Sequence, residues 1–259
     1  GNAQTDSGSG EHSVIFEHVD FVYPDGEEAV LKDISFSAKS GETVAFIGST
    51  GSGKSSLIQL IPRFYDRASG NIYIDGQKIE DLDINALRSK IGFVPQKAHL
   101  FSGTIEENIR FGKPDATMDE IIHAAKIAQA YDFIMEKPHQ FQEQIVEGAT
   151  NVSGGQKQRL SIARALIRKP EIYIYDDSFS ALDFKTDARL RKALKPEIKN
   201  AIVFLVAQRV STILDADKIV VLDECKIAGI GTHRELLASC PIYYEIAASQ
   251  LSNEELTYA

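Results

Sequence analysis

Short apolar runs separated by turn residues make up much of the chain. Between Val14 and Phe36, apolar and polar positions alternate around the turn Pro24-Asp25-Gly26, which predicts a small antiparallel sheet. Other runs are apolar without interruption, as buried strands are. Strands are therefore expected at 43–47, 71–74, 91–94, 172–175, 202–206 and 219–222, with short helices at 56–61 and 84–89. This mixture predicts an α/β fold.

The pattern becomes helical in the middle of the chain, over residues 100–168. Thr117 and Glu120 have the spacing of a capping box, in which each side chain bonds the other residue's backbone N–H, and apolar residues follow at helical spacing. Thr232 and Glu235 repeat this spacing before a C-terminal helix.

These patterns suggest a division of the chain. Residues 1–12 have the polar, Gly/Ser-rich composition of a flexible linker and suggest a piece cut from a longer polypeptide. We expect the sheet core to comprise about 13–98 and 169–259 and an inserted helical subdomain to comprise about 99–168.

A glycine-rich segment lies between the predicted strand 43–47 and the predicted helix 56–61. It has the pattern G-x-x-x-x-G-K-S, in which backbone N–H groups surround an anion, Lys54 reaches the terminal phosphates and the Ser55 hydroxyl can hold Mg²⁺. A Gly/Ser-rich turn is the structural alternative, but it leaves the flanking strand and helix unexplained. The segment therefore predicts binding of a nucleoside triphosphate by Gly48, Ser49, Thr50, Gly51, Ser52, Gly53, Lys54 and Ser55.

A second glycine-rich segment, Ser153 to Gln156, opens the helix that ends before Pro170. Ser153 and Gln156 have capping-box spacing, which is a purely structural account. However, Gly154 and Gly155 each cost about 0.8–1 kcal/mol relative to alanine in a helix. They are explained if a large anion approaches the exposed N–H groups, and we favour that interpretation.

Two acidic residues, Asp176 and Asp177, directly follow the predicted buried strand 172–175. Open α/β sheets bind ligands at the carboxyl ends of their strands. An acidic residue at that edge, far in sequence from a phosphate loop, is expected to hold Mg²⁺ through water.

Composition narrows the functional classes. Of the 259 residues, 43% are hydrophobic and 25% charged, as in soluble globular proteins. The net charge of −9 argues against a nucleic-acid partner. Cys225 and Cys240 do not form a C-x-x-C pair, so reduced structural cysteines are expected. No apolar run approaches the ~20 residues of a membrane-spanning helix.

The order of these motifs, with Gln96 and the segment Ser180 to Asp183, resembles the ATPase domains of ATP-binding cassette (ABC) transporters, exporter type. The resemblance extends from about Val14 to Gln250. It implies a RecA-like P-loop ATPase core with an N-terminal antiparallel β subdomain and an inserted helical subdomain. It also implies that two cassettes pair head to tail, so that each ATP lies between one chain's phosphate loop and the other chain's Ser153–Gln156 signature.

The resemblance assigns roles to individual positions. Tyr23 falls where the family stacks an aromatic ring on adenine, and Ser56 completes the phosphate loop. ATP contacts are implied for Tyr23, Gly48, Ser49, Thr50, Gly51, Ser52, Gly53, Lys54, Ser55, Ser56, Gln96, Ser153, Gly154, Gly155, Gln156, Asp176 and Asp183. The implied Mg²⁺ ligands are Ser55, Gln96 and Asp176, and the implied catalytic positions are Asp177, Gln208, Lys54 and Gln96.

Two of these positions depart from the family pattern. Asp177 stands where the family usually has the glutamate that activates water, and Gln208 stands where it usually has a histidine. The shorter carboxylate would lie farther from the water, and glutamine lacks the protonation equilibrium of histidine. Because the signature keeps Ser-Gly-Gly-Gln, with only Val152 unusual, we expect a slow site here and an active site completed on a non-identical partner.

The resemblance also implies a transmembrane domain and a location at the cytoplasmic face of the plasma (inner) membrane, with this fragment soluble by itself. Drugs, lipids and peptides all remain open as cargo. A soluble ABC ATPase of DNA repair or translation is the alternative. Such proteins tend to carry coiled-coil insertions, tandem cassettes or basic surfaces, and this acidic chain has none of these features.

Overall fold

The structure is a computed structural model that describes residues 11–49 and 51–258. Thr50, one of the predicted ATP contacts, lies outside the described residues. The strands are β1 (Ser13–Phe21), β2 (Leu31–Lys39), β3 (Thr43–Gly48), β4 (Ser69–Ile74), β5 (Gln77–Lys78), β6 (Ile91–Val94), β7 (Gly103–Thr104), β8 (Gln144–Ile145), β9 (Ile172–Asp176), β10 (Ile202–Val206), β11 (Lys218–Asp223) and β12 (Lys226–Gly231).

The helices follow the strands closely in sequence. They are α1 (Lys54–Gln59), α2 (Ile84–Ser89), α3 (Ile105–Arg110), α4 (Met118–Ile127), α5 (Tyr131–Glu136), α6 (Gly154–Leu166), α7 (Phe184–Glu197), α8 (Val210–Ile213), α9 (His233–Ser239), α10 (Pro241–Gln250) and α11 (Asn253–Tyr258), with short 3-10 turns at Ile79–Asp81, Gln140–Gln142 and Glu147–Ala149. In the part of the chain that the structure describes, no helix has the length and apolar character to cross a membrane.

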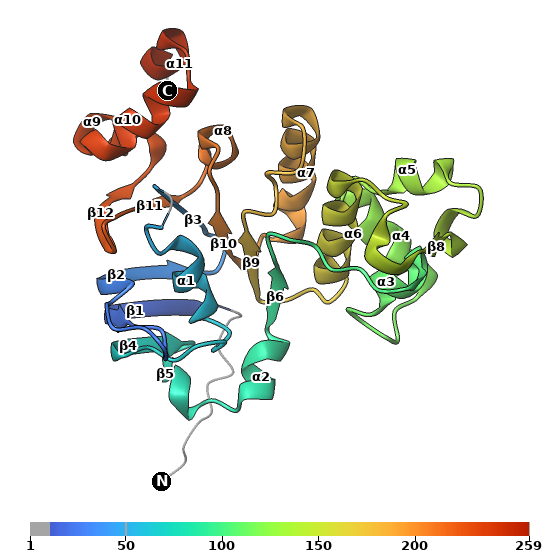
Figure 1. Cartoon of the computed structure of the whole chain (residues 1–259), viewed down its shortest axis with the longest axis horizontal. Helices are drawn as coiled ribbons and strands as arrows, with labels where there is room; N and C mark the ends of the chain where they lie inside the picture. The colour runs from blue at the N-terminus through green and yellow to red at the C-terminus, as the bar shows by residue number, and fades with distance from the viewer. Residues whose placement is uncertain (1–10, 50, 259) are drawn as a thin grey trace.

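The centre of the molecule is a six-stranded sheet in the order β12-β11-β3-β10-β9-β6 (Figure 1). The five strands from β11 to β6 are parallel to their neighbours, and β12 pairs antiparallel with β11 at one edge. Every residue of β9 and β10 is buried, because both faces of this sheet are covered. The uninterrupted apolar runs therefore identified the central strands correctly.

An antiparallel sheet in the order β2-β1-β4-β5 packs against one face of the central sheet. Aromatic rings connect the two sheets. The ring centroid of Phe36 in β2 lies 5.4 Å from that of Phe46 in β3, and the latter lies 6.1 Å from the ring centroid of Phe204 in β10. Leu57 and Ile58 of α1 belong to the same apolar cluster. The predicted antiparallel sheet is confirmed, and β4 extends it.

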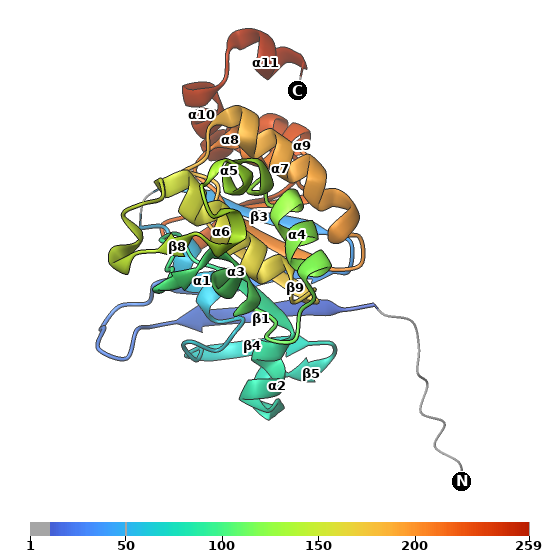
Figure 2. The same ribbon diagram turned by 90° about the vertical axis from the view of Figure 1, so that its right-hand side faces the viewer.

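Helices α3 to α6 lie together beside the central sheet, in green and olive on the right of Figure 1 and facing the viewer in Figure 2. Helix α6 packs on α3, on α4 and on β6. The region is not helical throughout, because β7 and β8 form a two-stranded sheet in which Gly103 pairs with Ile145. Such a pairing between distant segments has no signature in local periodicity.

Hydrogen bonds at the helix starts refine the capping predictions. Ser153 forms the full box: its hydroxyl accepts from the Gln156 N–H, and the Gln156 side chain accepts from the Ser153 N–H. Thr117 and Thr232 form only half of theirs. Their hydroxyls accept the expected backbone bond, but they also donate to the carboxylates of Glu120 and Glu235, at 3.5 and 3.1 Å. This contact holds the glutamates at the threonine side chains.

Candidate nucleotide-binding site

The glycine-rich loop leaves the carboxyl end of β3 and enters α1, as predicted (Figure 1). Gly48 packs closely on the neighbouring strand, since a Cβ there would lie 2.2 Å from the carbonyl oxygen of Leu222. Gly53, immediately before the helix, has a φ of 98°, which favours glycine. The chain thus needs glycine at both ends of the loop for purely conformational reasons.

The first two residues of α1 contact two different elements. Lys54 contacts the start of the loop, and Ser55 contacts the end of β9. The Lys54 ammonium donates a 2.8 Å hydrogen bond to the carbonyl oxygen of Gly48. The Ser55 hydroxyl donates a 3.0 Å bond to Oδ1 of Asp176. Burial lowers the pKa of Lys54, partly offset by the charges of Asp177 and Asp176. Phosphate oxygens would give this ammonium stronger acceptors than the carbonyl it contacts here.

An unpaired polar group also marks the loop. The Ser52 side chain is 2% exposed, and its hydroxyl oxygen has no hydrogen-bond partner among the described residues. Buried hydroxyls are normally paired, so this one is available to a bound group. With the ammonium of Lys54 and the hydroxyl of Ser55, it forms a donor set that fits the phosphates of a nucleotide and a Mg²⁺ ion.

Asp176 and Asp177 lie at the carboxyl end of β9 and are 8% and 7% exposed. Burial raises the pKa of both carboxyls, and for Asp177 the neighbouring charge of Asp176 raises it further. Burying a carboxylate has a desolvation cost, so a cation beside these two would lower the free energy of the site. Asp176 and Ser55, two of the predicted metal ligands, are in direct contact, whereas Gln96, the third, contacts Asp177 instead.

The backbone presents Asp177 in an unusual conformation. Its φ of 52° lies in the left-handed region, which aspartate tolerates better than most residues. The Asp177 N–H donates a 2.8 Å bond to the carbonyl oxygen of Val206, the last residue of β10. Gln96 donates from Nε2 to Oδ2 of Asp177 at 3.2 Å. Three separate segments therefore position this carboxylate.

Gln208 and Asp183 are near the same edge, but each has a different environment. Gln208 follows β10 and is exposed, and its carbonyl oxygen accepts a 2.8 Å bond from the Gln250 side chain. Asp183 caps α7 by accepting from the N–H of Thr186 at 2.7 Å, and this bond lowers the pKa of its carboxyl. Helix capping thus gives Asp183 a structural role in addition to the predicted ATP contact.

Tyr23 lies next to the phosphate loop, as its predicted adenine contact requires. Its hydroxyl forms a 2.6 Å hydrogen bond with the Ser56 hydroxyl in α1. The centroid of its ring lies 4.8 Å from the ring centroid of Phe21 and 5.1 Å from that of Tyr65. Tyr65, which sequence analysis did not single out, lies beside both rings and extends this aromatic surface.

The signature segment lies on a different part of the molecule. It begins α6, which packs on α3 and α4, whereas the phosphate loop leads into α1, which packs on β3, β9 and β10 (Figure 1). Gly154 is exposed, and no atom of residues 11–49 and 51–258 lies within 4 Å of the position a Cβ would take. The fold of this chain therefore does not require glycine there, which agrees with an anion approaching from outside.

One contact that sequence analysis missed joins the signature helix to the loop of Gln96. Gln158 of α6 is 3% exposed, and its side-chain amide donates to the carbonyl oxygen of Gln96. The oxygen of the same amide, Oε1 of Gln158, is buried without a hydrogen-bond partner among the described residues. Gln158 is part of an ordinary helical pattern in the sequence, so no local signal distinguishes it.

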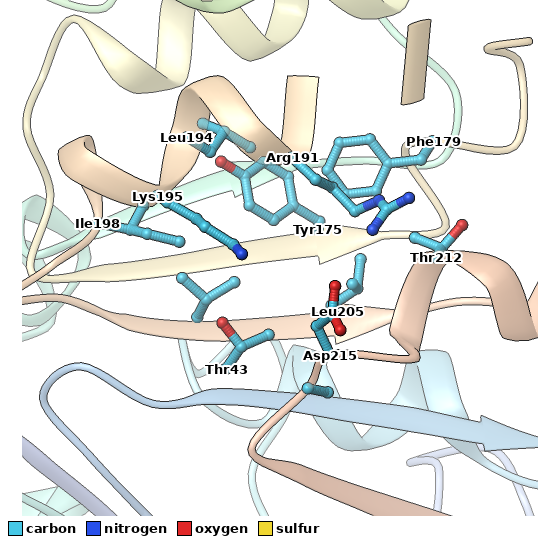
Figure 3. Close-up of a pocket in the computed structure, with 12 residues that line it drawn as sticks. Thr43, Tyr175, Phe179, Arg191, Leu194, Lys195, Ile198, Leu205, Thr212 and Asp215 are labelled. Atoms are coloured by element: carbon cyan, nitrogen blue, oxygen red, sulfur yellow. The ribbon is translucent and has the colours of Figure 1, made fainter. Parts of the chain in front are cut away.

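The apolar hollow shown in Figure 3 is separate from this site. It has a volume of about 90 Å³ and lies between α7, α8 and the central sheet, with Tyr175, Leu194 and Leu205 among its lining residues. Among the residues that the structure describes, none of the phosphate loop, the signature or the Asp176–Asp177 pair lines it. The hollow therefore has no direct part in nucleotide binding.

Comparisons with known proteins agree with this geometry. The family model described as "ABC transporter" matches residues 31–180. An uncharacterized ABC transporter ATP-binding protein of Bacillus subtilis (strain 168) is 47% identical over 241 residues, which are 93% of this chain and 42% of that protein. A putative multidrug export ATP-binding/permease protein of Staphylococcus aureus (strain NCTC 8325 / PS 47) is 48% identical over 237 residues, 92% of this chain and 41% of that protein.

A solved structure is similar over almost the whole chain. It is the structure of a bacterial Atm1-family ABC exporter with ATP bound, with a TM-score of 0.90 and 37% sequence identity. The match covers 94% of this chain and 43% of that one. The present chain therefore spans less than half of the length of the relatives it matches.

Proposed function

Because the chain belongs to the ABC transporter family, we propose that it is the ATP-binding cassette of a membrane exporter. The observation that carries this proposal is the 3.0 Å bond between Ser55 and Asp176, which brings the phosphate loop to an acidic strand end. Relatives named as multidrug export ATP-binding/permease proteins support the exporter role. The part of these relatives outside the match would supply the transmembrane domain and place this cassette at the cytoplasmic face of the membrane.

The residues of the loop have distinct tasks in this proposal. Backbone N–H groups of the loop and Lys54 hold the phosphates, and Tyr23 provides a ring for the adenine. Ser55 and Asp176, with Gln96, would hold Mg²⁺, which neutralises charge on the phosphates when bound. Lys54 would then exchange its bond to the Gly48 carbonyl for phosphate oxygens, which are stronger acceptors.

The proposal includes slow hydrolysis at this chain's own phosphate loop. A general base must reach the attacking water at ~2.6–3.2 Å. Asp177 has one methylene fewer than glutamate, and its Oδ2 is already engaged by Gln96. Gln208 can donate a hydrogen bond to a phosphate but cannot change its charge near neutral pH.

A non-identical partner follows from this asymmetry. The signature at Ser153–Gln156 retains its capping box, and its first glycine, Gly154, is exposed. It would complete a nucleotide site on a partner cassette that carries the usual catalytic residues. The second, slow site would contain ATP between this chain's loop and the partner's signature.

Steady-state ATP hydrolysis by the purified chain, alone and mixed with candidate partner cassettes, tests the proposal. We expect binding of a fluorescent ATP analogue with little turnover by the chain alone, and faster turnover in a mixed pair. Fast hydrolysis by the chain alone that Asp177→Asn abolishes would refute the slow-site proposal. Absence of nucleotide binding would refute the function altogether.

A further inference from the structure

A cluster of three potential metal ligands lies outside the nucleotide site. It consists of His12, just before β1, Asp75, in the turn after β4, and Glu171, just before β9. One ligand atom from each residue lies within 4.8 Å of the other two. The residues come from both sheets, since β1 and β4 belong to the antiparallel sheet and β9 to the central one.

Two of the three distances between these atoms match tetrahedral coordination, and the third is within 4.8 Å. His12 Nδ1 lies 3.4 Å from Asp75 Oδ2 and 3.4 Å from Glu171 Oε2. Zinc bonds of 2.0–2.2 Å to nitrogen and oxygen place neighbouring ligand atoms about 3.3–3.5 Å apart in a tetrahedron. We propose that His12, Asp75 and Glu171 bind a divalent transition metal ion of the Zn²⁺ class, with water as the fourth ligand.

A protonated histidine between two carboxylates is the competing explanation. A charged hydrogen bond from nitrogen to a carboxylate is about 2.7–2.9 Å long, shorter than either contact here. The same chain contains such a close pair, since His18 Nδ1 lies 2.6 Å from Asp33 Oδ1. Moreover, Oε2 of Glu171 is buried and has no hydrogen-bond partner among the described residues. The two contacts of His12 thus have the spacing of ligands around an ion and not that of charged hydrogen bonds.

Backbone hydrogen bonds hold the ligands in place. The backbone N–H of His12 donates to the Ser40 hydroxyl at 2.6 Å. The backbone carbonyl oxygen of His12 accepts from the Ser40 N–H at 2.9 Å. The Ser13 N–H donates to Oδ1 of Asp75 at 2.9 Å, which leaves Oδ2 directed at the cluster. A bond to the second oxygen of a carboxylate ligand is the usual outer-shell support of a metal site.

Access and charge also bear on the site. A hollow of about 420 Å³, lined in part by His12 and Glu171, gives the ion and its water a route from solvent. Lys169 and Lys199 also line this hollow, and the Lys90 ammonium lies 3.4 Å from Oδ2 of Asp75. Because Lys90 competes with a cation for the same oxygen, its removal should tighten metal binding.

The ion would connect the start of β1 with the turn after β4 and the start of β9. The two sheets would then be joined at this edge by coordination in addition to apolar packing. Because only the folded chain brings the three ligands together, bound Zn²⁺ should raise the melting temperature.

The test is a Zn²⁺ titration of the nucleotide-free, metal-stripped chain against a chromophoric chelator, with thermal unfolding as a second measurement. We expect one Zn²⁺ per chain and a higher melting temperature with the ion. His12→Ala and Glu171→Gln should weaken binding by at least about 100-fold, the upper end of the loss from removing an outer-shell group. Co²⁺ in place of Zn²⁺ should give the visible absorption of a tetrahedral site.

Three further variants make the result specific. His18→Ala removes a histidine paired with a single carboxylate and should leave Zn²⁺ affinity unchanged. Asp176→Asn tests the other acidic site and should also retain binding. Lys90→Gln should bind Zn²⁺ as tightly as the parent or more tightly. The proposal is overturned if His12→Ala binds like the parent, if Asp176→Asn abolishes binding, or if Lys90→Gln weakens it.

Discussion

The side chain of Gln96 donates a 3.2 Å hydrogen bond to Oδ2 of Asp177, across 81 positions of sequence. Gln96 follows β6 and Asp177 follows β9, and these two strands are neighbours in the central sheet. Gln158 of the signature helix donates to the carbonyl oxygen of the same glutamine. The carboxylate at the proposed catalytic position is thus connected through Gln96 to the helix that begins with the signature.

The first prediction concerns the two departures from the family pattern. Asp177→Glu combined with Gln208→His should raise ATP turnover at this chain's own site by at least about tenfold, because a positioned general base contributes ~10²–10⁴-fold. The gain is limited because position 177 has a φ of 52°, which suits glutamate less well than aspartate. Single-turnover hydrolysis in the assembled pair measures it.

A control belongs with that experiment. Adding Lys54→Met to the double variant should remove the gain, because the nucleotide would no longer be held at this loop. An unchanged rate in the double variant would show that the slow step has another cause, such as the partner's signature.

Lys54→Met alone should weaken nucleotide binding without loss of stability. A charged hydrogen bond is worth about 1.5–3 kcal/mol, which corresponds to roughly 10–100-fold in affinity. Since burial lowers the pKa of Lys54, its charge is unfavourable in the nucleotide-free fold, so the variant should melt at the same or a higher temperature. Fluorescent-nucleotide titration and thermal unfolding measure the two effects.

Lys113→Met is the matched control, because Lys113 pairs with Glu120 at 2.7 Å on the helical part of the chain. It should leave nucleotide affinity unchanged. Equal losses of affinity in both lysine variants would mean that net charge, and not the phosphate loop, governs binding.

The third prediction is a pH dependence of stability. The folded protein raises the pKa of Asp177, so it retains this proton at a higher pH than the unfolded chain, whose aspartates titrate near 3.9. The free energy of unfolding therefore falls as pH rises from about 3.9 through the folded pKa. Asp177→Asn removes this loss, so the variant should equal the parent near pH 4 and exceed it at pH 7. Urea unfolding at both pH values provides the measurement.

Asp183→Asn provides a control of opposite sign. The bond from the Thr186 N–H lowers the pKa of Asp183, so its carboxylate adds stability above the unfolded pKa that is lost as pH falls through the folded pKa. This variant should be less stable than the parent at pH 7 and closer to it in acid. If the free energy of unfolding changed with pH in the same way in both variants and the parent, the opposite pKa shifts of Asp177 and Asp183 would be contradicted.

The fourth prediction separates stability from function at the signature. Gly154→Ala should stabilise the chain by up to about 1 kcal/mol, because glycine is the poorer helix former and no atom of the described residues obstructs the new methyl group. The same methyl group would cover N–H groups offered to the partner's nucleotide, so turnover by the mixed pair should fall. Urea unfolding and ATPase assays provide the two readouts.

Ser153→Ala is the informative comparison, because it removes both the cap and a predicted contact. It should destabilise the chain by about 1 kcal/mol and also lower turnover by the pair. If Gly154→Ala were stabilising and fully active, glycine at this position would have no role in ATP binding.

Local sequence was sufficient for much of this protein. Uninterrupted apolar runs predicted β3, β9, β10 and β11, because a strand buried on both faces must be apolar along its length. The glycine-rich loop was predictable because its function depends on consecutive residues between a strand and a helix. Capping by Ser153 was predictable for the same reason, since it joins residues three positions apart.

Tertiary structure decided the contacts between distant segments. Parallel strand order placed Ser55 beside Asp176 and Gln96 beside Asp177, and neither pair shares a local pattern. The pairing of β7 with β8 and the His12–Asp75–Glu171 cluster likewise depend on segments that meet only after the chain has packed. Periodicity reports the environment of one segment at a time, so it identified the elements but not the partners that packing brought to them.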